Sequence, residues 1–283
     1  MILKGIPYLQ TILTLLLCGT AFTARAQADS AEPADSCYPE IICPDSNRLG
    51  GNVAALEPLF QKLEALEKKD TTAVISILQI GDSHIQAGFF PNEVRENLQR
   101  EFGNAGRGLI VPLKLAGTNE PPDYAITSPN SWNRSNCITR AATEEPGMSG
   151  MSIVTYDRHI ELDIKTKEPF DRIWAFHHRE APLLTVPDSL SDGICASVAD
   201  SSFAHSDFYG FSLENGRSGV LYHSFGINGN TYAAINRNPQ IVRQASGLCP
   251  DLVIVSLGTN DSYGASFDPA DADVQITRLI DSI

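Results

Sequence analysis

Two runs of the chain are almost free of polar positions, and each of them stops at a glycine. Residues 73–80 end at Gly81, and residues 251–257 end at Gly258. A strand that is apolar on both faces is typical of a parallel sheet covered by helices. We therefore expect both runs to be buried strands of such a sheet.

Three other segments repeat apolar residues at intervals of three and four, which is the spacing of an amphipathic helix. Their apolar positions are Leu56, Leu59, Phe60, Leu63 and Leu66 in the first, Val94, Leu98 and Phe102 after Pro91 in the second, and Val274, Ile276, Leu279, Ile280 and Ile283 after Asp268-Pro269 in the third. Proline suits the first helical position, so the second and third helices should begin near Pro91 and Pro269. Helices that alternate with buried strands imply an α/β layer fold.

The stretch from residue 108 to residue 210 follows a different pattern. Turn residues are scattered through it, its apolar pieces are short, and no sustained helical period is present. This composition predicts an inserted β-rich module. The α/β domain would then consist of residues 51–107 and 211–283.

The N-terminus has the pattern of a secretion signal. A positive start is followed by the apolar residues 12–17 and by the small-residue site Ala24-Arg25-Ala26, so residues 1–26 should be removed on export. Residues 27–50 are rich in Ala, Asp, Ser, Pro and Gly, which predicts a flexible linker. We expect a periplasmic or extracellular protein with no integral membrane segment after cleavage. A core helix and lipid attachment at Cys18 remain alternatives for this segment.

The charge of the chain limits its partners. Acidic residues outnumber Lys and Arg by 34 to 21, which gives a formal net charge of -13. A strongly acidic chain repels phosphate backbones, so nucleic acid is not an expected partner. The composition gives no indication of oligomeric state.

Candidate chemistry begins with residues 81–84, Gly-Asp-Ser-His, which we call the Ser83 turn. It follows a predicted buried strand, at the edge where open α/β sheets bind ligands. A serine there can expose its hydroxyl and also offer its own N–H to a developing oxyanion. Gly-Asp-Ser is also ordinary turn chemistry, so this stretch alone leaves both interpretations open.

Two more turns share this placement. Residues 226–231 follow the apolar segment 219–225, and residues 258–261 follow the second buried run; we call them the Gly229 turn and the Asn260 turn. The N–H of Gly229 and the side-chain amide of Asn260 could join the N–H of Ser83 around one carbonyl oxygen. Each such donor contributes about 3 kcal/mol to transition-state stabilisation.

The three turns, in this order, resemble the first three sequence blocks of the SGNH (GDSL-like) hydrolases. The resemblance implies a three-layer α/β fold with a parallel sheet, and a serine esterase that requires no metal and no organic cofactor. It assigns Ser83 as the nucleophile and Gly229 and Asn260 as oxyanion donors, whereas Asp82 is expected to stabilise the turn. The stretch 102–108 and the β-rich insertion are similar to peptidoglycan O-acetylesterases, in which the insertion resembles a carbohydrate-binding module. An acylated glycan, carrying O-acetyl groups, is the substrate that this likeness implies.

One element of that family is missing. The family's base is the His of an Asp-x-x-His near the C-terminus, and no Asp-x-x-His occurs in the 283 residues. We expect the base and its Asp to lie beyond Ile283, in a longer parent protein. His84 is adjacent to Ser83 and is a poor base for it, while His223 is better explained as a packed strand residue. His177 and His178 follow a strand-like run, in which alternation sends their side chains to opposite faces and weakens a shared metal site. A non-catalytic glycan-binding protein, or an inactive fragment of the enzyme, is the alternative.

Overall fold

The computed structural model describes residues 49–140, 145–177, 194–197, 205–263 and 267–283, with backbone only for 194–197. The predicted signal, the alternative lipid site at Cys18 and nearly all of the predicted linker lie outside the described residues. No helix in the described ranges is long and apolar enough to cross a bilayer.

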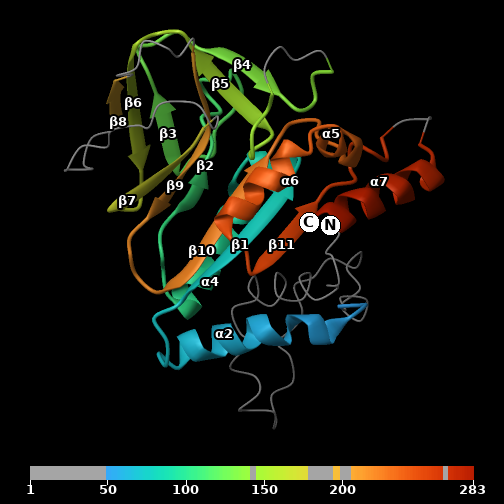
Figure 1. Ribbon diagram of the computed structural model, residues 1–283. Helices are drawn as coiled ribbons and strands as arrows, with labels where there is room; N and C mark the ends of the chain where they lie inside the picture. Colours follow the sequence, from blue (N-terminus) through green and yellow to red (C-terminus); the bar gives the residue numbers. More distant parts are fainter. Residues whose placement is uncertain (1–48, 141–144, 178–193, 198–204, 264–266) are drawn as a thin grey trace, which may run out of the picture.

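A three-stranded parallel sheet forms the centre of the α/β domain (Figure 1). Its strand order is β10 (Gly219–Gly226), β1 (Val74–Gly81) and β11 (Leu252–Ser256). The register pairs Gly81 with Gly226 on one side and with Ser256 on the other. The three strands therefore end at one edge, and the three predicted turns all begin there.

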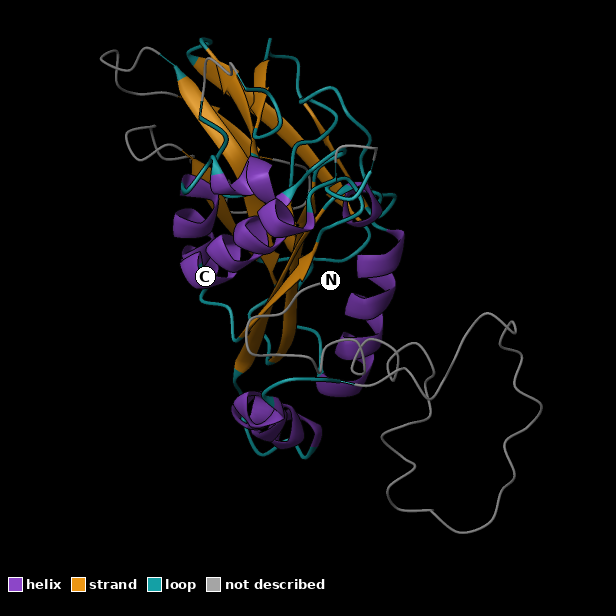
Figure 2. Ribbon diagram, turned by 90° about the vertical axis from the view of Figure 1, so that its right-hand side faces the viewer, coloured by secondary structure: helices purple, strands orange, loops and turns teal. Residues whose placement is uncertain are grey.

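Helices cover both faces of this sheet, which makes three layers (Figure 2). The helices are η3 (Val53–Leu56), α2 (Glu57–Glu67), α3 (Ser83–Gln86), α4 (Phe89–Phe102), α5 (Tyr232–Asn236), α6 (Gln240–Ala245), η4 (Ser246–Leu248) and α7 (Pro269–Ser282). Alternation along β1 sends Ile75 and Ile77 into the core with α2 and α4, and Leu78 and Ile80 into the core with α6. The expected α/β fold with a three-layer parallel sheet is confirmed.

The last helix differs from its expected burial. Of its apolar residues only Leu279 is buried, whereas Val274 is 60% exposed. The reason is that α7 packs mainly on the short helix α5, where Asn236 Nδ2 donates to the carbonyl of Gln275 at 2.8 Å. One neighbour of five residues covers only a narrow stripe of a longer helix.

The insertion is built of antiparallel strands. They are β2 (Gly108–Ile110), β3 (Tyr124–Thr127), β4 (Asn133–Asn136), β5 (Met151–Thr155), β6 (His159–Thr166), β7 (Arg172–His177), β8 (Ile194–Ser197) and β9 (Ser206–Glu214). One sheet has the order β2-β9-β5-β4, with β7 also paired to β9, and the other has the order β3-β6-β8. The predicted β-rich character is confirmed, and β9 continues beyond residue 210 before β10 begins the α/β domain again.

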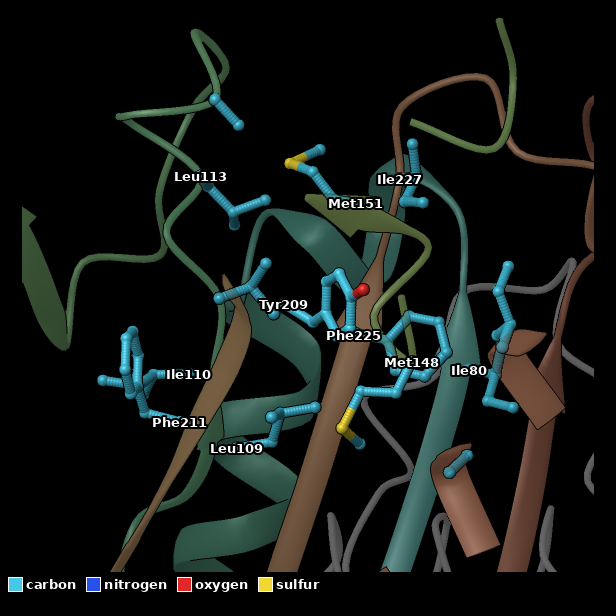
Figure 3. Close-up of a cluster of buried hydrophobic side chains, with 14 of the residues drawn as sticks. Ile80, Leu109, Ile110, Leu113, Met148, Met151, Tyr209, Phe211, Phe225 and Ile227 are labelled. Carbon is cyan, nitrogen blue, oxygen red and sulfur yellow. The ribbon is translucent and has the colours of Figure 1, made fainter. Parts of the chain in front are cut away.

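Insertion and α/β domain share one apolar core (Figure 3). Ile80 of β1 and Phe225 of β10 lie in the same cluster as Met148, Met151 and Tyr209 of the insertion. Full burial of each such side chain stabilises the folded state by roughly 1.5–3 kcal/mol. Because the two parts bury these groups together, the insertion is fixed to the domain.

A buried ionic cluster joins the same two parts. Arg107 Nε lies 2.8 Å from Asp123 Oδ2, and Arg95 Nη1 of α4 lies 3.3 Å from the same oxygen. Arg95 Nη2 also pairs with Glu168 Oε1 at 3.3 Å. Burial by itself would raise the pKa of the Asp123 carboxyl, but the charges of Arg107 and Arg95 lower that pKa below its ordinary value. The carboxylate therefore stays ionised and holds α4 to the insertion.

Candidate active site

Ser83 stands at the first position of α3, directly after β1. Asp82 is the N-cap of this helix, and its Oδ1 accepts the N–H of His84 at 3.0 Å. This is the turn-stabilising role expected for Asp82. A Cβ on Gly226 would lie 2.3 Å from the carbonyl oxygen of Asp82 and 2.4 Å from the nitrogen of Gln86. Only glycine at this strand end lets the Ser83 turn pack so closely on β10.

The backbone N–H groups of Ser83 and Gly229 have no acceptor among the described residues. In the Ser83 turn, Ile85 and Gln86 both donate to the carbonyl of Asp82, while no acceptor takes the N–H of Ser83. In the Gly229 turn, Asn228 and Asn230 are both paired through their N–H groups, while that of Gly229 is not. The protein leaves both N–H groups free at one sheet edge, so both are available to a ligand oxygen.

Asn260 is tied to the other two turns by a relay of hydrogen bonds. Its Nδ2 donates to the carbonyl of Asn230 at 2.9 Å, and the fully buried Asn230 donates from its own Nδ2 to the carbonyl of Gly81 at 3.0 Å. Asn230 Oδ1 also accepts the N–H of Thr231 at 3.0 Å. A side-chain amide carries two N–H donors, so Asn260 keeps one for a ligand. Its side chain is half-buried at the sheet edge and does not enter the core.

Asn230 was not recognised as a site residue from the sequence, although it lies inside the Gly229 turn. Its importance depends on two partners that are distant along the chain, Gly81 and Asn260. The available signal was the position of an amide side chain between the turn glycine and the N-cap Thr231 of α5.

Asp261 is a second carboxylate at this edge. Its Oδ1 accepts the N–H of Tyr232 at 3.0 Å, while its Oδ2 is buried without a partner among the described residues. Burial, together with the nearby charge of Asp82, raises the pKa of the Asp261 carboxyl above its ordinary value. The buried, unpartnered Oδ2 and the nearby charge of Asp82 therefore both disfavour the ionised form of Asp261.

No hydrogen bond joins Ser83 to a histidine in the described part of the chain. The His84 side chain is 72% exposed, and its Nδ1 lies 3.0 Å from Asp82 Oδ1. His223 is buried in β10, where its Nδ1 accepts the N–H of Leu109 at 3.1 Å. Burial, reinforced by the charge of Arg107, lowers the pKa of His223 to about 3. His223 is thus a neutral, packed strand residue as expected, and His178 lies outside the described residues.

The described residues form no metal site, and their open cleft lies away from the three turns. No group of three His, Cys, Asp or Glu side chains among them could hold a metal ion. An open cleft of about 630 Å³ lies between α6 and β7, lined by residues such as His177, Tyr209 and Arg243. None of Ser83, Gly229 and Asn260 lines it, so it is separate from the edge where the three turns meet.

Comparison with known proteins settles the family. The family model for GDSL-like lipases and acylhydrolases matches residues 77–283, which include all three turns. The chain belongs to the GDSL-like lipase/acylhydrolase family. It is therefore an ester-hydrolysing enzyme by family, as the three turns predicted.

A solved structure supports the fold. The structure of a peptidoglycan O-acetylesterase matches with a TM-score of 0.60 at 20% sequence identity, over 81% of this chain and 70% of that one. At this identity the likeness establishes the architecture. Among curated proteins, no relative matches.

Proposed function

We propose that the protein is an exported serine esterase that removes O-acetyl groups from a cell-wall or other glycan. The observation that carries this proposal is that the N–H groups of Ser83 and Gly229 have no acceptor among the described residues, while the side-chain amide of Asn260 uses only one of its two N–H donors. Three donors at one sheet edge suit the oxygen of a tetrahedral intermediate in acyl transfer. The glycan and the export are supported by the solved O-acetylesterase and by the N-terminal signal pattern, respectively.

The reaction proceeds in two steps. Ser83 Oγ attacks the acetyl carbonyl carbon while a base takes the hydroxyl proton, and the three donors hold the resulting oxyanion. The intermediate collapses, the bond from the acetyl carbon to the sugar oxygen breaks, and the proton passes to that oxygen. Water then attacks the acetyl-serine, which releases acetate and restores Ser83.

The base is the element that the described residues do not supply. No Asp-x-x-His occurs in the sequence, and no described histidine bonds to Ser83. Without a base a serine hydroxyl is a weak nucleophile, so we expect this polypeptide alone to show slow, Ser83-dependent hydrolysis.

Chemical rescue tests the proposal. With p-nitrophenyl acetate as substrate, added imidazole can act as a general base. We expect imidazole to accelerate the purified chain well above Ser83→Ala, with Ser131→Ala, an exposed serine of the insertion, behaving as wild type. Asn260→Ala should lower the rescued rate about 10²-fold, because it removes one oxyanion donor.

The control for Asn260 is Asn133→Ala, which removes an exposed amide from β4 and should leave the rescued rate unchanged. Equal rates for the wild type and Ser83→Ala in imidazole would reject Ser83 as the nucleophile. Retained binding of an acetylated glycan in that case would favour the non-catalytic glycan-binding alternative.

A further inference from the structure

We propose that Gln86 is a positioning residue, which holds the Gly229 turn so that the N–H of Gly229 faces the oxyanion. The inference rests on the proposed function and extends it to a residue that makes no contact with the reacting atoms. Gln86 lies at the end of α3, three residues after Ser83, and its side chain is buried.

The carboxamide of Gln86 is used at both ends. Its Oε1 accepts the backbone N–H of Asn228, the residue immediately before Gly229, at 2.8 Å. Its Nε2 lies 2.8 Å from Thr118 Oγ1 and 2.9 Å from Asn119 Oδ1, so it donates into the insertion. A side chain on the nucleophile's own helix thus holds the loop that carries the second oxyanion donor.

Asn228 closes this network. Its Nδ2 donates to Asn119 Oδ1 at 2.9 Å and lies 3.2 Å from Thr118 Oγ1. Gln86, Asn228, Thr118 and Asn119 therefore form a ring of hydrogen bonds across three segments of the chain. Rings of this kind fix geometry more firmly than a single pair, because each bond orients the next.

The Gly229 turn needs such support. Gly229 has φ +80°, a left-handed conformation that glycine adopts without strain, and the nearest atom to a Cβ placed there is 3.7 Å away. Among the described residues, neither steric crowding nor side-chain packing restrains Gly229. The orientation of the Gly229 N–H therefore depends on the neighbouring peptide groups. Gln86 holds the peptide group on the N-terminal side through the N–H of Asn228.

The test compares two buried glutamines. Gln86→Met keeps the approximate volume and removes the hydrogen bonds, while Gln99→Met does the same on α4, where Gln99 bonds to the carbonyls of Gly106 and Val220 outside the site. In the imidazole-supplemented assay, we expect Gln86→Met to lower kcat at least about tenfold with KM changed less than about twofold, because the donor is misplaced and not removed. Gln99→Met should keep both constants near those of the wild type.

Amide hydrogen exchange gives a readout that does not depend on activity. The backbone N–H of Asn228 should exchange at least about tenfold faster in Gln86→Met than in the wild type, because this variant removes its acceptor. Its exchange rate should stay at the wild-type value in Gln99→Met, which keeps the acceptor. If the wild type shows no Ser83-dependent turnover, the proposed function fails for this chain and the exchange result alone decides the role of Gln86. Wild-type kcat in folded Gln86→Met, or unchanged exchange at Asn228, would overturn the inference.

A surface variant covers the case in which Gln86→Met does not fold. Asn119→Ala removes an exposed side chain that both Gln86 and Asn228 contact, so it loosens the ring without disturbing the core. We expect a smaller loss of kcat, roughly threefold, at constant KM, since the bond from Asn228 to Gln86 remains. An unchanged kcat in Asn119→Ala, with wild-type exchange at Asn228, would equally count against the proposal.

Discussion

His223 makes the stability of this protein depend on acid. The imidazole is buried in β10 and neutral, its Nδ1 accepts the N–H of Leu109, and its Nε2 has no partner among the described residues. In the unfolded chain the same side chain is exposed and takes up a proton near its ordinary pKa. Acid therefore favours the unfolded state over the range between the two pKa values.

The magnitude follows from those values. The folded-state pKa is lowered from 6.5 to about 3, so the unfolded state binds more protons between these limits and stability falls as the pH falls through that window. Linkage over this window gives a loss of about 2 kcal/mol between pH 7 and pH 5 from this one group. Folded domains are usually stable by 5–15 kcal/mol, so a loss of this size removes about one seventh or more of the free energy of unfolding.

His223→Asn isolates the effect. Asparagine can place an oxygen near the position of Nδ1 and accept the N–H of Leu109, but it does not titrate. Urea unfolding of both proteins should be measured at several pH values from 7 to 5, and the difference in free energy of unfolding should shrink by about 2 kcal/mol toward pH 5. His159→Asn, an exposed residue at the start of β6, should keep a constant difference from the wild type.

A difference between wild type and His223→Asn that does not change with pH would refute this reasoning, because it would mean that His223 is protonated alike in both states. The same variant also tests catalysis. His223 is engaged with Leu109 and is not bonded to Ser83, so His223→Asn should keep the imidazole-rescued rate at pH 7. A loss specific to that rate, in a folded variant, would identify His223 as part of the proton path.

Two further substitutions test the turns. Asn230→Ala should lower the free energy of unfolding by about 2 kcal/mol, because it leaves the N–H of Thr231 without its acceptor and the carbonyl of Gly81 with only the N–H of Ile227, at 3.3 Å. Thermal or urea unfolding beside Asn133→Ala checks this. Asp261→Asn should stabilise the protein at pH 7 by less than about 1 kcal/mol, since the carboxyl is partly exposed and screened. Its raised pKa means that stability falls as the pH rises above the ordinary value for Asp, so the gain should vanish toward pH 3. Destabilisation at pH 7 in Asp261→Asn, or none in Asn230→Ala, would contradict these roles.

The central sheet could be predicted from the sequence because its signals are local. Strands β1 and β11 are continuous apolar runs that end at glycine, and the structure places both strands within one residue of the predicted bounds. Helix α4 begins two residues before Pro91, since Gly88 with φ +80° provides an earlier start. Periodicity indicated α7 but not its burial, which depends on the partner that it finds.

Contacts between distant segments could not be predicted in this way. The acceptors of the Gln86 amide are 32 and 33 residues away, and Asn228 is 142 residues away. Nothing in the local pattern around Gln86 distinguishes it from other polar residues of a short helix. The same holds for Arg95 and Arg107, whose shared carboxylate, Asp123, lies in a turn-rich stretch.

These distant contacts connect the insertion to the turns at the end of the sheet. Backbone donors such as the N–H groups of Ser83 and Gly229 depend on loop conformation, and loops keep a conformation only when other groups restrain them. Here the restraint comes from Thr118 and Asn119 at one point of the insertion and from Cys137, whose thiol lies 3.6 Å from Asn230 Oδ1, at another. The shared core and the Arg95–Arg107–Asp123 cluster hold the insertion to the sheet. Loss of these contacts should therefore loosen the N–H groups of Ser83 and Gly229 before it unfolds the sheet, since the sheet has its own second core against α2 and α4.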